Sequence, residues 1–589
     1  MTNPVKRLRD RLNQTGVDAY IVPSFDSHQS EYVAPHFKKR EWLTGFTGSA
    51  GTAIVTQDHA VLWTDGRYHT QAQRQLAGGP FSLIREGLPG EPTMEEWLRD
   101  LLPDHAVIGF DGSCLNQVTF AVIQERTKDK EFSFSIDTCL LDGLWDDRPP
   151  LPKEPVIDFP LAFAGASRLD KLDRVRSKMT EWNVDLYLIP NLDDIAWLMN
   201  IRGADIPFCP FVLSYLTIAH DQTTLFIHQE KLPKQLIADF KEQGIRLVPY
   251  ESIYEALRKT DKRRILFDPQ QVSAKLFSSV PEGCQMIPKG DLVTKMKAVK
   301  SEAELRNIHN AQVKDGVAMM HFLVWLTDQV PKGSITELDI GEQVAHFRSN
   351  QPNWLGPSFD PIAAYKENAA MMHYKATQEN HAVIGSEGFL LIDSGGQYMD
   401  GTTDITRTVA LGPVTKEEQV DYTLTLKAHI GLSQAIFLEG TCGPHIDVLA
   451  RRHMWNRGLD YKCGTGHGIG YALGVHEGPH RIRNNDNAVP LEPGMLVTNE
   501  PGVYKPGRHG VRIENTVCVR LHQQTEFGRF YRFETISFCP IDTTPIVLDL
   551  LTDEEKDWLN AYHRTVYETL APQLEGRVLE RLQEWTKPV

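Results

Sequence analysis

The sequence predicts an α/β (α+β) protein with two successive α/β domains of one design, followed by one larger domain of strands and helices. An internal repeat in the first half of the chain and a proline-rich linker between its copies predict this division. Length alone, at roughly 150 residues per domain, corresponds to about four domains for 589 residues. The repeat and the linker reduce this number to three.

The repeat consists of two strand-like segments with the same landmarks. Residues 17–26 read VDAYIVPSFD and residues 184–193 read VDLYLIPNLD. In each, an apolar run leads into Pro and Asp follows three positions later, as expected for a buried strand that ends in a loop. A Trp-Leu pair comes next, at Trp42 and Trp197, with Gly six positions beyond the Trp. Between these landmarks the first copy is about twelve residues longer, around SHQSEYVAPHFKKRE.

Domain boundaries are predicted from local composition. Residues 146–155 contain four prolines in DDRPPLPKEP, which excludes a continuous helix or a central strand. Ser301 and Glu304 form a capping-box pattern that opens a long helix, expected to reach about Leu326. Further amphipathic helices are expected at 4–15, 168–182 and 554–585. The predicted domains are 1–150, 151–299 and 300–589.

Composition excludes several classes of protein. The hydrophobic fraction of 41% and the charged fraction of 24% are those of a globular chain. A net charge of −15 argues against nucleic acid and anionic lipid as partners. No apolar run approaches 18 residues, and the N-terminus lacks a signal-like apolar region. The eight cysteines form no CxxC pair, so reduced thiols and a cytoplasmic location are expected.

Two aspartates follow one another on neighbouring predicted strands. GFLLIDSGG (388–396) contains an apolar run ending at Asp393, and DGTTDITRTVAL (400–411) is a β-type run around Asp404. Neighbouring strands joined by a short turn can place both carboxylates on one face. Such carboxylates repel each other unless a proton or a metal ion lies between them. Taken alone, each Asp is better explained as a residue that ends a strand and caps a loop.

Three further candidate ligands lie at or near predicted strand ends. His467 is surrounded by glycines in GTGHGIG, a loop that permits close approach of bulky groups and lacks the Lys of a phosphate-binding loop. Glu500 ends the strand of LEPGMLVTNEPGVY (491–504). In HGVRIENTVCV (509–519), Arg512 and Glu514 are two positions apart and are expected on one face of a single strand.

Together, Asp393, Asp404, His467, Glu500 and Glu514 provide four carboxylates and one imidazole. Oxygen-rich sets with one nitrogen suit divalent ions such as Mn²⁺, Co²⁺ or Zn²⁺. Four negative charges exceed the need of one dication and roughly balance two. Two ions about 3.5–4 Å apart that share a bridging water are hydrolytic machinery.

These five residues and the motifs around them resemble the pita-bread metallopeptidase family. The order Asp, Asp eleven residues later, His in a Gly-rich loop, Glu in an EPG turn and Glu in an RIEN strand is similar to that family's metal signature. WLTGFTGSAGTAIV, AVLWTDGRY, KAVKSEAEL, MMHY and HEGP extend the resemblance along most of the chain, and make it most similar to the three-domain cytosolic Xaa-Pro aminopeptidases. The resemblance implies two creatinase-like N-terminal domains followed by a pita-bread catalytic domain.

The resemblance also implies roles for individual residues. Asp404 and Glu514 would bridge two ions, Asp393 would complete one, and His467 with Glu500 the other. Glu500 would also act as the general base. His476 matches a histidine that contacts substrate and helps protons reach the leaving group, and His373 one that lines the pocket around the scissile bond. Arg512 matches an arginine beside the ligands.

One position departs from the family pattern. Four residues before the loop histidine the family usually has another histidine, whereas this chain has Cys463. A thiol is smaller than imidazole and donates weakly, so we expect an altered contact with the site or the substrate and intact metal binding. Binding of a softer metal or reaction with oxidants is the alternative.

The resemblance implies release of the N-terminal residue from peptides with proline at position two. Two divalent ions, with Mn²⁺ preferred, are the expected cofactors, and a homodimer through the catalytic domain is the expected assembly. A prolidase that splits X-Pro dipeptides is the alternative enzyme, and residues 1–300 exceed what such enzymes usually carry. Creatinase-like C–N hydrolysis and a catalytically dead pita-bread binding module would both lack metal ligands, and all five ligands are present.

Overall fold

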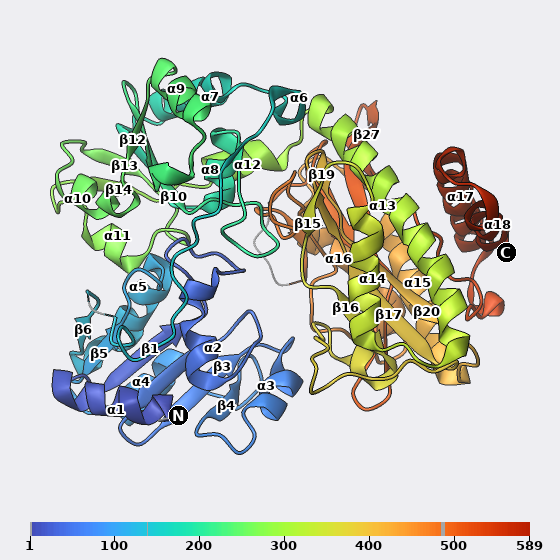
Figure 1. The fold of residues 1–589 in the computed structure, drawn as a ribbon, viewed down its shortest axis with the longest axis horizontal. Helices are drawn as coiled ribbons and strands as arrows, with labels where there is room; N and C mark the ends of the chain where they lie inside the picture. Colours follow the sequence, from blue (N-terminus) through green and yellow to red (C-terminus); the bar gives the residue numbers. More distant parts are fainter. Residues whose placement is uncertain (1–2, 138, 485–488) are drawn as a thin grey trace. The chain divides into compact units, whose positions relative to one another are not determined.

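The computed structural model divides the chain into two compact units (Figure 1). The described residues are 3–137, 139–484 and 489–589. Unit 1 comprises Met1–Pro207 and Phe211–Val293, and unit 2 comprises Phe208–Pro210 and Thr294–Val589.

Unit 1 contains two six-stranded sheets with the same strand order and the same strand directions. In each, the strand formed by the repeated segment pairs antiparallel on one side and parallel on the other. The first sheet is β4 (Ser82–Arg85), β3 (Ala60–Thr64), β2 (Thr52–Thr56), β1 (Ala19–Pro23), β5 (Val107–Phe110), β6 (Ser133–Ser135). The second is β12 (Ile245–Val248), β11 (Thr223–Ile227), β10 (Ser214–Ala219), β8 (Leu186–Ile189), β13 (Arg264–Leu266), β14 (Gln285–Ile287). The predicted repeat is therefore confirmed as two copies of one fold.

The helices before each copy form where the sequence predicts them. Helix α1 buries Val5, Leu8 and Leu12, the apolar side of an amphipathic helix, and ends at Gly16 with φ of 68°. Helix α7 begins with a capping box between Ser167 and Asp170. The helices of this part are α1 (Pro4–Thr15), α2 (Lys39–Thr44), α3 (His69–Gln75), α4 (Met94–Leu101), α5 (Gln117–Arg126), α6 (Leu161–Ala164), α7 (Arg168–Glu181), α8 (Leu192–Leu198), α9 (Lys234–Glu242), α10 (Ile253–Arg258), α11 (Ala274–Ser278) and α12 (Leu292–Ala298), and the short strands are β7 (Ile157–Asp158) and β9 (Ile201–Arg202).

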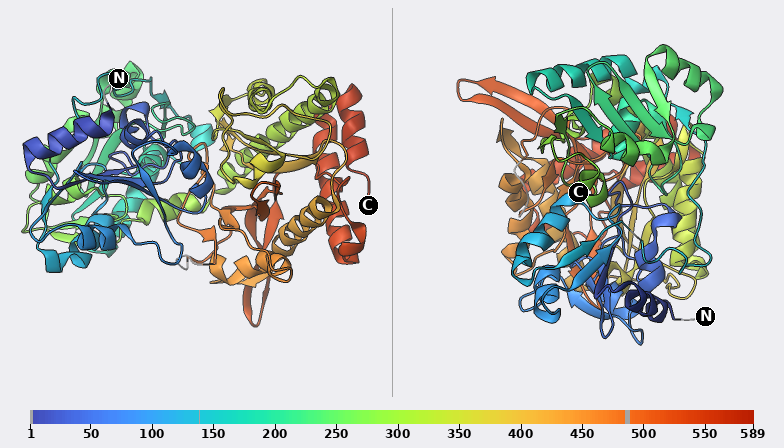
Figure 2. Two further views of the ribbon diagram at one scale, coloured as in Figure 1. Left: turned by 90° about the horizontal axis from the view of Figure 1, so that it is seen from below. Right: turned by 90° about the vertical axis from the view of Figure 1, so that its left-hand side faces the viewer.

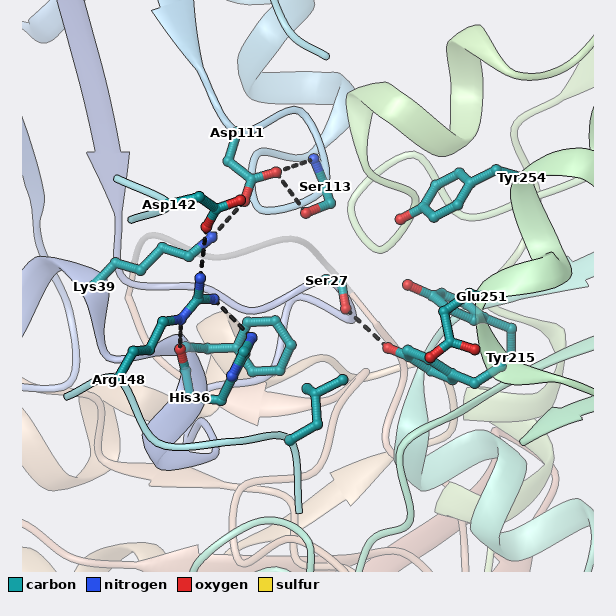
Figure 3. Close-up of a pocket in the computed structure, with 13 residues that line it drawn as sticks. Ser27, His36, Lys39, Asp111, Ser113, Asp142, Arg148, Tyr215, Glu251 and Tyr254 are labelled. Atoms are coloured by element: carbon teal, nitrogen blue, oxygen red, sulfur yellow. Dashed lines mark hydrogen bonds and ion pairs between the residues drawn. The ribbon is translucent and has the colours of Figure 1, made fainter. Parts of the chain in front are cut away.

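The extra residues of the first copy contact segments of the second copy. The ring nitrogens of His28 lie 2.8 Å from the Pro190 carbonyl oxygen and 2.7 Å from the Tyr250 hydroxyl. Beside this contact is a cavity of about 260 Å³, lined on one side by Lys39 and Arg148 and on the other by tyrosines (Figure 3). None of the predicted site residues lines this cavity.

The first half of unit 2 is a three-stranded antiparallel sheet covered by two helices. The core between them includes Met319, Phe322, Ile340 and Ile392. Helix α13 begins with the predicted capping box of Ser301 and Glu304. The elements are α13 (Glu302–Gln329), α14 (Glu337–Ser349), β16 (Ile362–Tyr365), β17 (Phe389–Ser394) and β20 (Ile405–Ala410), with β15 (Trp354–Pro357), β18 (Gly396–Tyr398) and β19 (Gly401–Thr402) in a smaller sheet.

The second half repeats this arrangement with another helix pair and another sheet. The residues packed between them include Leu424, Ala428, Ile446 and Val517. The elements are α15 (Lys416–Ser433), α16 (Gly443–Trp455) and the sheet β21 (Ile436–Leu438), β28 (Gly528–Thr535), β27 (Asn515–Thr525), β24 (Leu496–Asn499). Two-stranded ladders pair β22 (Gly466–His467) with β23 (Arg481–Ile482) and β25 (Gly502–Lys505) with β26 (His509–Arg512).

The C-terminal part of unit 2 contains the amphipathic helices that the sequence predicts, α17 (Asp553–Leu570) and α18 (Gly576–Trp585). Leu559, Val566 and Leu582 are fully buried in a core that these helices share with α13 and α15. No helix among the described residues is long and apolar enough to cross a membrane.

The single strand predicted over 509–519 is wrong in one respect. The structure ends β26 at Arg512 and begins β27 at Asn515, so Ile513 and Glu514 lie between two strands. The backbone changes partner here, because the Glu514 N–H donates to the Thr406 carbonyl and not to a neighbouring strand of either ladder. This break directs Glu514 toward β20.

Candidate metal centre

The two aspartates come from adjacent antiparallel strands, as the sequence predicts. Asp393 lies in β17 and pairs with Thr406 of β20, and Asp404 immediately precedes β20. Residues that lie opposite each other in a ladder share a face, and so do side chains two positions apart on one strand. Asp404 therefore lies on the same face as Thr406, and hence on the same face as Asp393. Both carboxylates are buried, with 8% and 3% of their surfaces exposed.

His467 is placed by a loop in which glycines allow very close packing. A Cβ atom on Gly466 would lie 1.9 Å from the Thr498 carbonyl oxygen, and one on Gly468 would lie 2.1 Å from the Glu477 carbonyl oxygen. Any larger residue would push these segments apart. The bulky groups that the Gly-rich loop accommodates are therefore its own neighbouring backbone segments.

The two glutamates are held by threonine hydroxyls. Glu500 follows β24 directly, and the Thr498 hydroxyl donates to its Oε1 over 3.3 Å. The Thr406 hydroxyl donates to Glu514 Oε2 over 2.6 Å. Each hydroxyl orients one carboxylate and leaves its other oxygen available.

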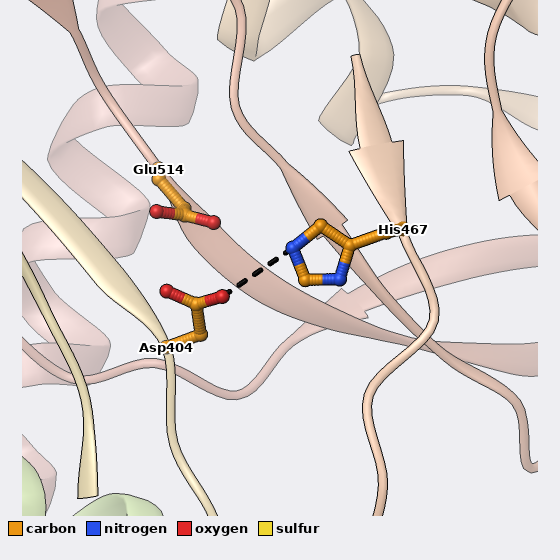
Figure 4. A group of neighbouring side chains, drawn as sticks. All are labelled: Asp404, His467 and Glu514. Atoms are coloured by element: carbon orange, nitrogen blue, oxygen red, sulfur yellow. Dashed lines mark ion pairs between the residues drawn. The ribbon is translucent and has the colours of Figure 1, made fainter. Parts of the chain in front are cut away.

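Asp404, His467 and Glu514 converge so closely that one ion fits between them (Figure 4). Each offers one ligand atom, and the three atoms lie within 4.8 Å of one another. His467 Nε2 is 3.4 Å from Asp404 Oδ2 and 3.6 Å from Glu500 Oε1. The structure thus brings a fourth predicted ligand, Glu500, to the same imidazole.

The charges of this cluster favour a bound cation. Two carboxylate oxygens within 4.8 Å of each other repel by about 3.5 kcal/mol or more at an effective dielectric constant of about 20. Burial, followed by the charges of Asp404, Asp393 and Glu500, raises the pKa of Glu514 well above its usual value. Oδ1 of Asp393 and of Asp404 are buried without a hydrogen-bond partner among the described residues. Buried carboxylate oxygens without a proton donor are the ligands that a hard divalent ion takes, so the donor set fits the metals that the sequence predicts.

The pKa values of Asp393 and His467 reflect the same crowding of charges. Burial raises the pKa of Asp393 to about 6, opposed by Arg512 and reinforced by Asp404 and Glu500. For His467, burial lowers the pKa, but the Asp404 and Glu500 carboxylates outweigh it and raise the value to about 9. In the metal-free protein the imidazole is therefore a cation near pH 7.

Arg512 forms an ion pair with Asp393. Its Nη2 contacts Asp393 Oδ2 and its Nη1 donates to the Tyr504 hydroxyl over 2.8 Å. Its Nη2 also lies 3.4 Å from the carbonyl oxygen of Met372, the residue before His373. Arg512 thus orients one predicted ligand and anchors the MMHY segment to the same site.

His476, His373 and Cys463 are the other predicted site residues. The His476 side chain is exposed and its ring lies edge-on to His467, with 4.3 Å between centroids. His373 is partly buried and follows the residue that Arg512 contacts. Burial, followed by the charge of Glu500, raises the pKa of the Cys463 thiol to about 12, so in the metal-free protein this side chain is a neutral thiol near pH 7.

Several supporting residues were not predicted from the sequence. Thr406 holds Glu514 from 108 positions away in the chain. Thr498 and Tyr504 hold Glu500 and Arg512 from within eight positions. Nothing in their local patterns distinguishes these three from other strand residues, and only the register of the strands identifies them.

Comparison with known sequences defines the class of protein. The sequence model of metallopeptidase family M24 matches residues 306–520, and that of its C-terminal region matches residues 529–589. Two models of the creatinase/prolidase N-terminal domain match residues 4–136 and 147–304. The chain belongs to the M24 metallopeptidase family, with two creatinase-type N-terminal domains ahead of the pita-bread domain, which confirms the resemblance seen in the sequence.

Within this family, the chain is similar over its full length to proteins named as aminopeptidases. "Aminopeptidase P2" of Arabidopsis thaliana is 38% identical, covering 97% of this chain and 85% of that protein. "Xaa-Pro aminopeptidase 1" of Dictyostelium discoideum is 36% identical over 100% and 96% of the two chains. The X-prolyl aminopeptidase of Caenorhabditis elegans, described as a cytosolic enzyme with a di-nuclear active site, is 34% identical with a TM-score of 0.94 over 100% of this chain and 99% of that chain.

A solved dipeptidase matches a smaller part of the molecule. The Xaa-Pro dipeptidase of Bacillus anthracis is 25% identical with a TM-score of 0.52, and 99% of it is covered by 64% of this chain. More than a third of this chain therefore has no counterpart in that dipeptidase, as expected from the duplicated N-terminal domains.

Proposed function

We propose that the protein is a metal-dependent aminopeptidase that releases the N-terminal residue from peptides with proline at position two. The observation that carries this proposal is a buried cluster of carboxylates and one histidine in a chain similar over its full length to enzymes of that name. A prolidase activity is less supported, because the solved dipeptidase corresponds to only part of the chain.

The site residues have the following proposed roles. Asp404, Glu514, Asp393, His467 and Glu500 would together hold two divalent ions, with Asp404 and Glu514 shared between them, Asp393 on one and His467 with Glu500 on the other. Two bound ions would lower the pKa of a water molecule and polarise the scissile carbonyl group. Mn²⁺ is the preferred ion, since oxygen ligands dominate and only one nitrogen is present.

The chain's own residues perform the proton transfers. Glu500, oriented by Thr498, accepts a proton from the attacking water. His476 is exposed beside His467 and assists at the carbonyl oxygen and the leaving group. The nitrogen of an X-Pro amide has no hydrogen and must be protonated for cleavage to finish. His373 lines the pocket around the scissile bond, and Arg512 favours the ionised form of Asp393.

Metal reconstitution tests this function. We expect the metal-stripped protein to be inactive on an Arg-Pro-Pro peptide and to regain release of free Arg when Mn²⁺ is added, with Co²⁺ and Zn²⁺ assayed separately. An Arg-Ala-Pro peptide is the matched control and should not be cleaved. Failure of all three ions to restore release would contradict the assignment, and turnover of the dipeptide Arg-Pro without turnover of the tripeptide would indicate a prolidase.

Cys463 is proposed to shape the surroundings of the site without binding metal. Replacing it with His is expected to change kcat/KM among X-Pro peptides by about threefold to tenfold, or about 0.7 to 1.4 kcal/mol, because a larger donor replaces a neutral thiol. Both ions should be retained, as measured by metal analysis. An unchanged rate and substrate profile would show that the position is inert.

A homodimer through the catalytic domain is also proposed. Apolar side chains are exposed on β21 and on the β27–β28 hairpin, which extends from its sheet in Figure 2: Ile436 55%, Leu438 44%, Leu521 54% and Phe527 77%. Exposed apolar side chains of this kind suit a protein contact. Sedimentation of the protein as a monomer at micromolar concentration would rule this assembly out.

The domain boundaries and the cellular location are also proposals, each with its own test. Division into 1–150, 151–299 and 300–589 is supported by the irregular, proline-rich segment near residue 150, and limited proteolysis there would test it. A cytoplasmic location is supported by eight free cysteines and by the cytosolic relative, and is tested by cell fractionation.

A further inference from the structure

Three buried charged side chains lie outside the proposed ligand set. Lys297, Lys300 and Glu477 expose 1%, 4% and 3% of their surfaces. Lys297 Nζ is 3.2 Å from Glu477 Oε2, and Lys300 Nζ forms an ion pair with Glu477 Oε1. The Lys300 ammonium also donates to the Lys297 carbonyl over 2.8 Å. One carboxylate therefore binds two ammonium groups.

These residues belong to two of the sequence motifs described above. Lys297 and Lys300 lie in KAVKSEAEL, at the end of α12 and just before the N-cap residue Ser301 of α13. Glu477 lies in HEGP and directly follows His476. The ion pairs thus attach the loop that carries His476 to the start of unit 2.

The same residues contact the segments that carry two proposed metal ligands. The Glu477 N–H donates to the Gly468 carbonyl over 2.8 Å, next to His467. The Lys300 N–H donates to the Gly494 carbonyl over 3.0 Å, in the turn before the strand that ends next to Glu500. Gly494 has φ of 97°, and a Cβ there would lie 2.8 Å from the Lys300 carbonyl oxygen. Lys300 and Glu477 therefore connect three loops around the site.

Stability alone does not account for this cluster. Removing three charged groups from water is expensive, and buried ion pairs are often no more stabilising than apolar side chains of similar volume. With two ammonium groups and one carboxylate, these three side chains also carry an excess positive charge. These ion pairs instead hold the HEGP loop in a fixed position relative to Gly468.

We propose that Lys297, Lys300 and Glu477 are positioning residues that hold His476 against His467 for catalysis, an inference that rests on the proposed function. The His476 side chain is exposed, whereas the next residue is buried and anchored through both its side chain and its backbone. A displacement of about 1 Å at a reacting group can lower a rate by about 100-fold. The cluster acts on His476 through the chain and does not contact the substrate.

Glu477→Asp tests the proposal while keeping the charge. The shorter side chain withdraws the carboxylate from one or both lysines, so we expect kcat on Arg-Pro-Pro to fall about 10- to 100-fold. KM and a content of two ions per chain should stay within about twofold of the parent values, since no ligand is changed. Lys295→Met, at an exposed lysine of the same helix as Lys297, is the matched control and should leave kcat unchanged.

A second variant separates positioning from folding. Lys297→Met/Lys300→Met/Glu477→Leu removes all three charges together, so it should fold, as judged by circular dichroism and thermal melting, and still show the reduced kcat. Unchanged kcat in either folded variant would overturn the proposal, as would loss of activity in proportion to lost metal. An inactive wild-type protein would instead contradict the proposed function.

Discussion

Replacing Asp404 with Asn is expected to lower kcat/KM on X-Pro peptides by about 10³-fold or more, corresponding to about 4 kcal/mol of lost transition-state stabilisation. Asp404 contacts the His467 imidazole and lies within 4.8 Å of the Glu514 ligand atom. Loss of its charge removes a proposed bridge between two ions. Metal analysis should show fewer than two ions per chain. Asp549→Asn, at an exposed position of the same unit, is the control and should retain both ions and activity.

The same variant has an opposite expected effect on the metal-free protein. In the metal-free wild type, the pKa of Asp393 is raised to about 6 and that of Glu514 is raised well above its usual value, so folding favours their protonated forms. Because the folded state then binds more protons than the unfolded state, stability falls as pH rises through these folded pKa values. These groups should therefore make the metal-free wild type progressively less stable relative to metal-free Asp404→Asn as the pH rises from 5 to 8. Asp404→Asn removes one repelling charge and should weaken this dependence. A difference in melting temperature between the two metal-free proteins that stays constant from pH 5 to pH 8 would contradict the electrostatic account.

Replacing Glu500 with Gln is expected to lower kcat by about 10²- to 10⁴-fold, because an amide of the same shape cannot accept the proton of the attacking water. KM should change much less, since most substrate contacts remain. Steady-state kinetics at saturating Mn²⁺ provides the measurement. The matched control is Glu492→Gln, an exposed carboxylate in the same LEPG segment. Retained activity in Glu500→Gln would remove the proposed base and the two-metal mechanism that depends on it.

Much of the fold was predictable because it depends on short-range patterns. The repeated VDAYIVPSFD and VDLYLIPNLD segments form equivalent strands β1 and β8, and the capping box of Ser301 and Glu304 begins α13. Apolar periodicity and side chain-to-backbone hydrogen bonds act over a few residues, so the sequence contains them directly. The strand predicted over 509–519 was wrong because its break at Glu514 depends on Thr406, 108 residues away.

For the candidate site, the sequence likewise predicted the types of ligand residue but not the contacts that orient them. The residue types and their order identified the five proposed ligands, since carboxylates and imidazole are recognisable wherever they occur. The contacts that orient them were not recognisable: Arg512 with Asp393, Thr406 with Glu514, and Lys300 with Glu477 join residues far apart in the chain. Neither their pairing nor the raised pKa values follow from local spacing.

For this protein, the sequence by itself determined the duplicated α/β architecture, the acidic ligand set and the family resemblance. The tertiary structure decided which buried carboxylate oxygens lack a donor among the described residues, how close Asp404, His467 and Glu514 come, and which cations hold the surrounding loops. The physical reason is that local hydrogen bonding and apolar periodicity are encoded over a few residues. Electrostatic energies instead depend on distance and burial, which exist only once remote segments have packed together.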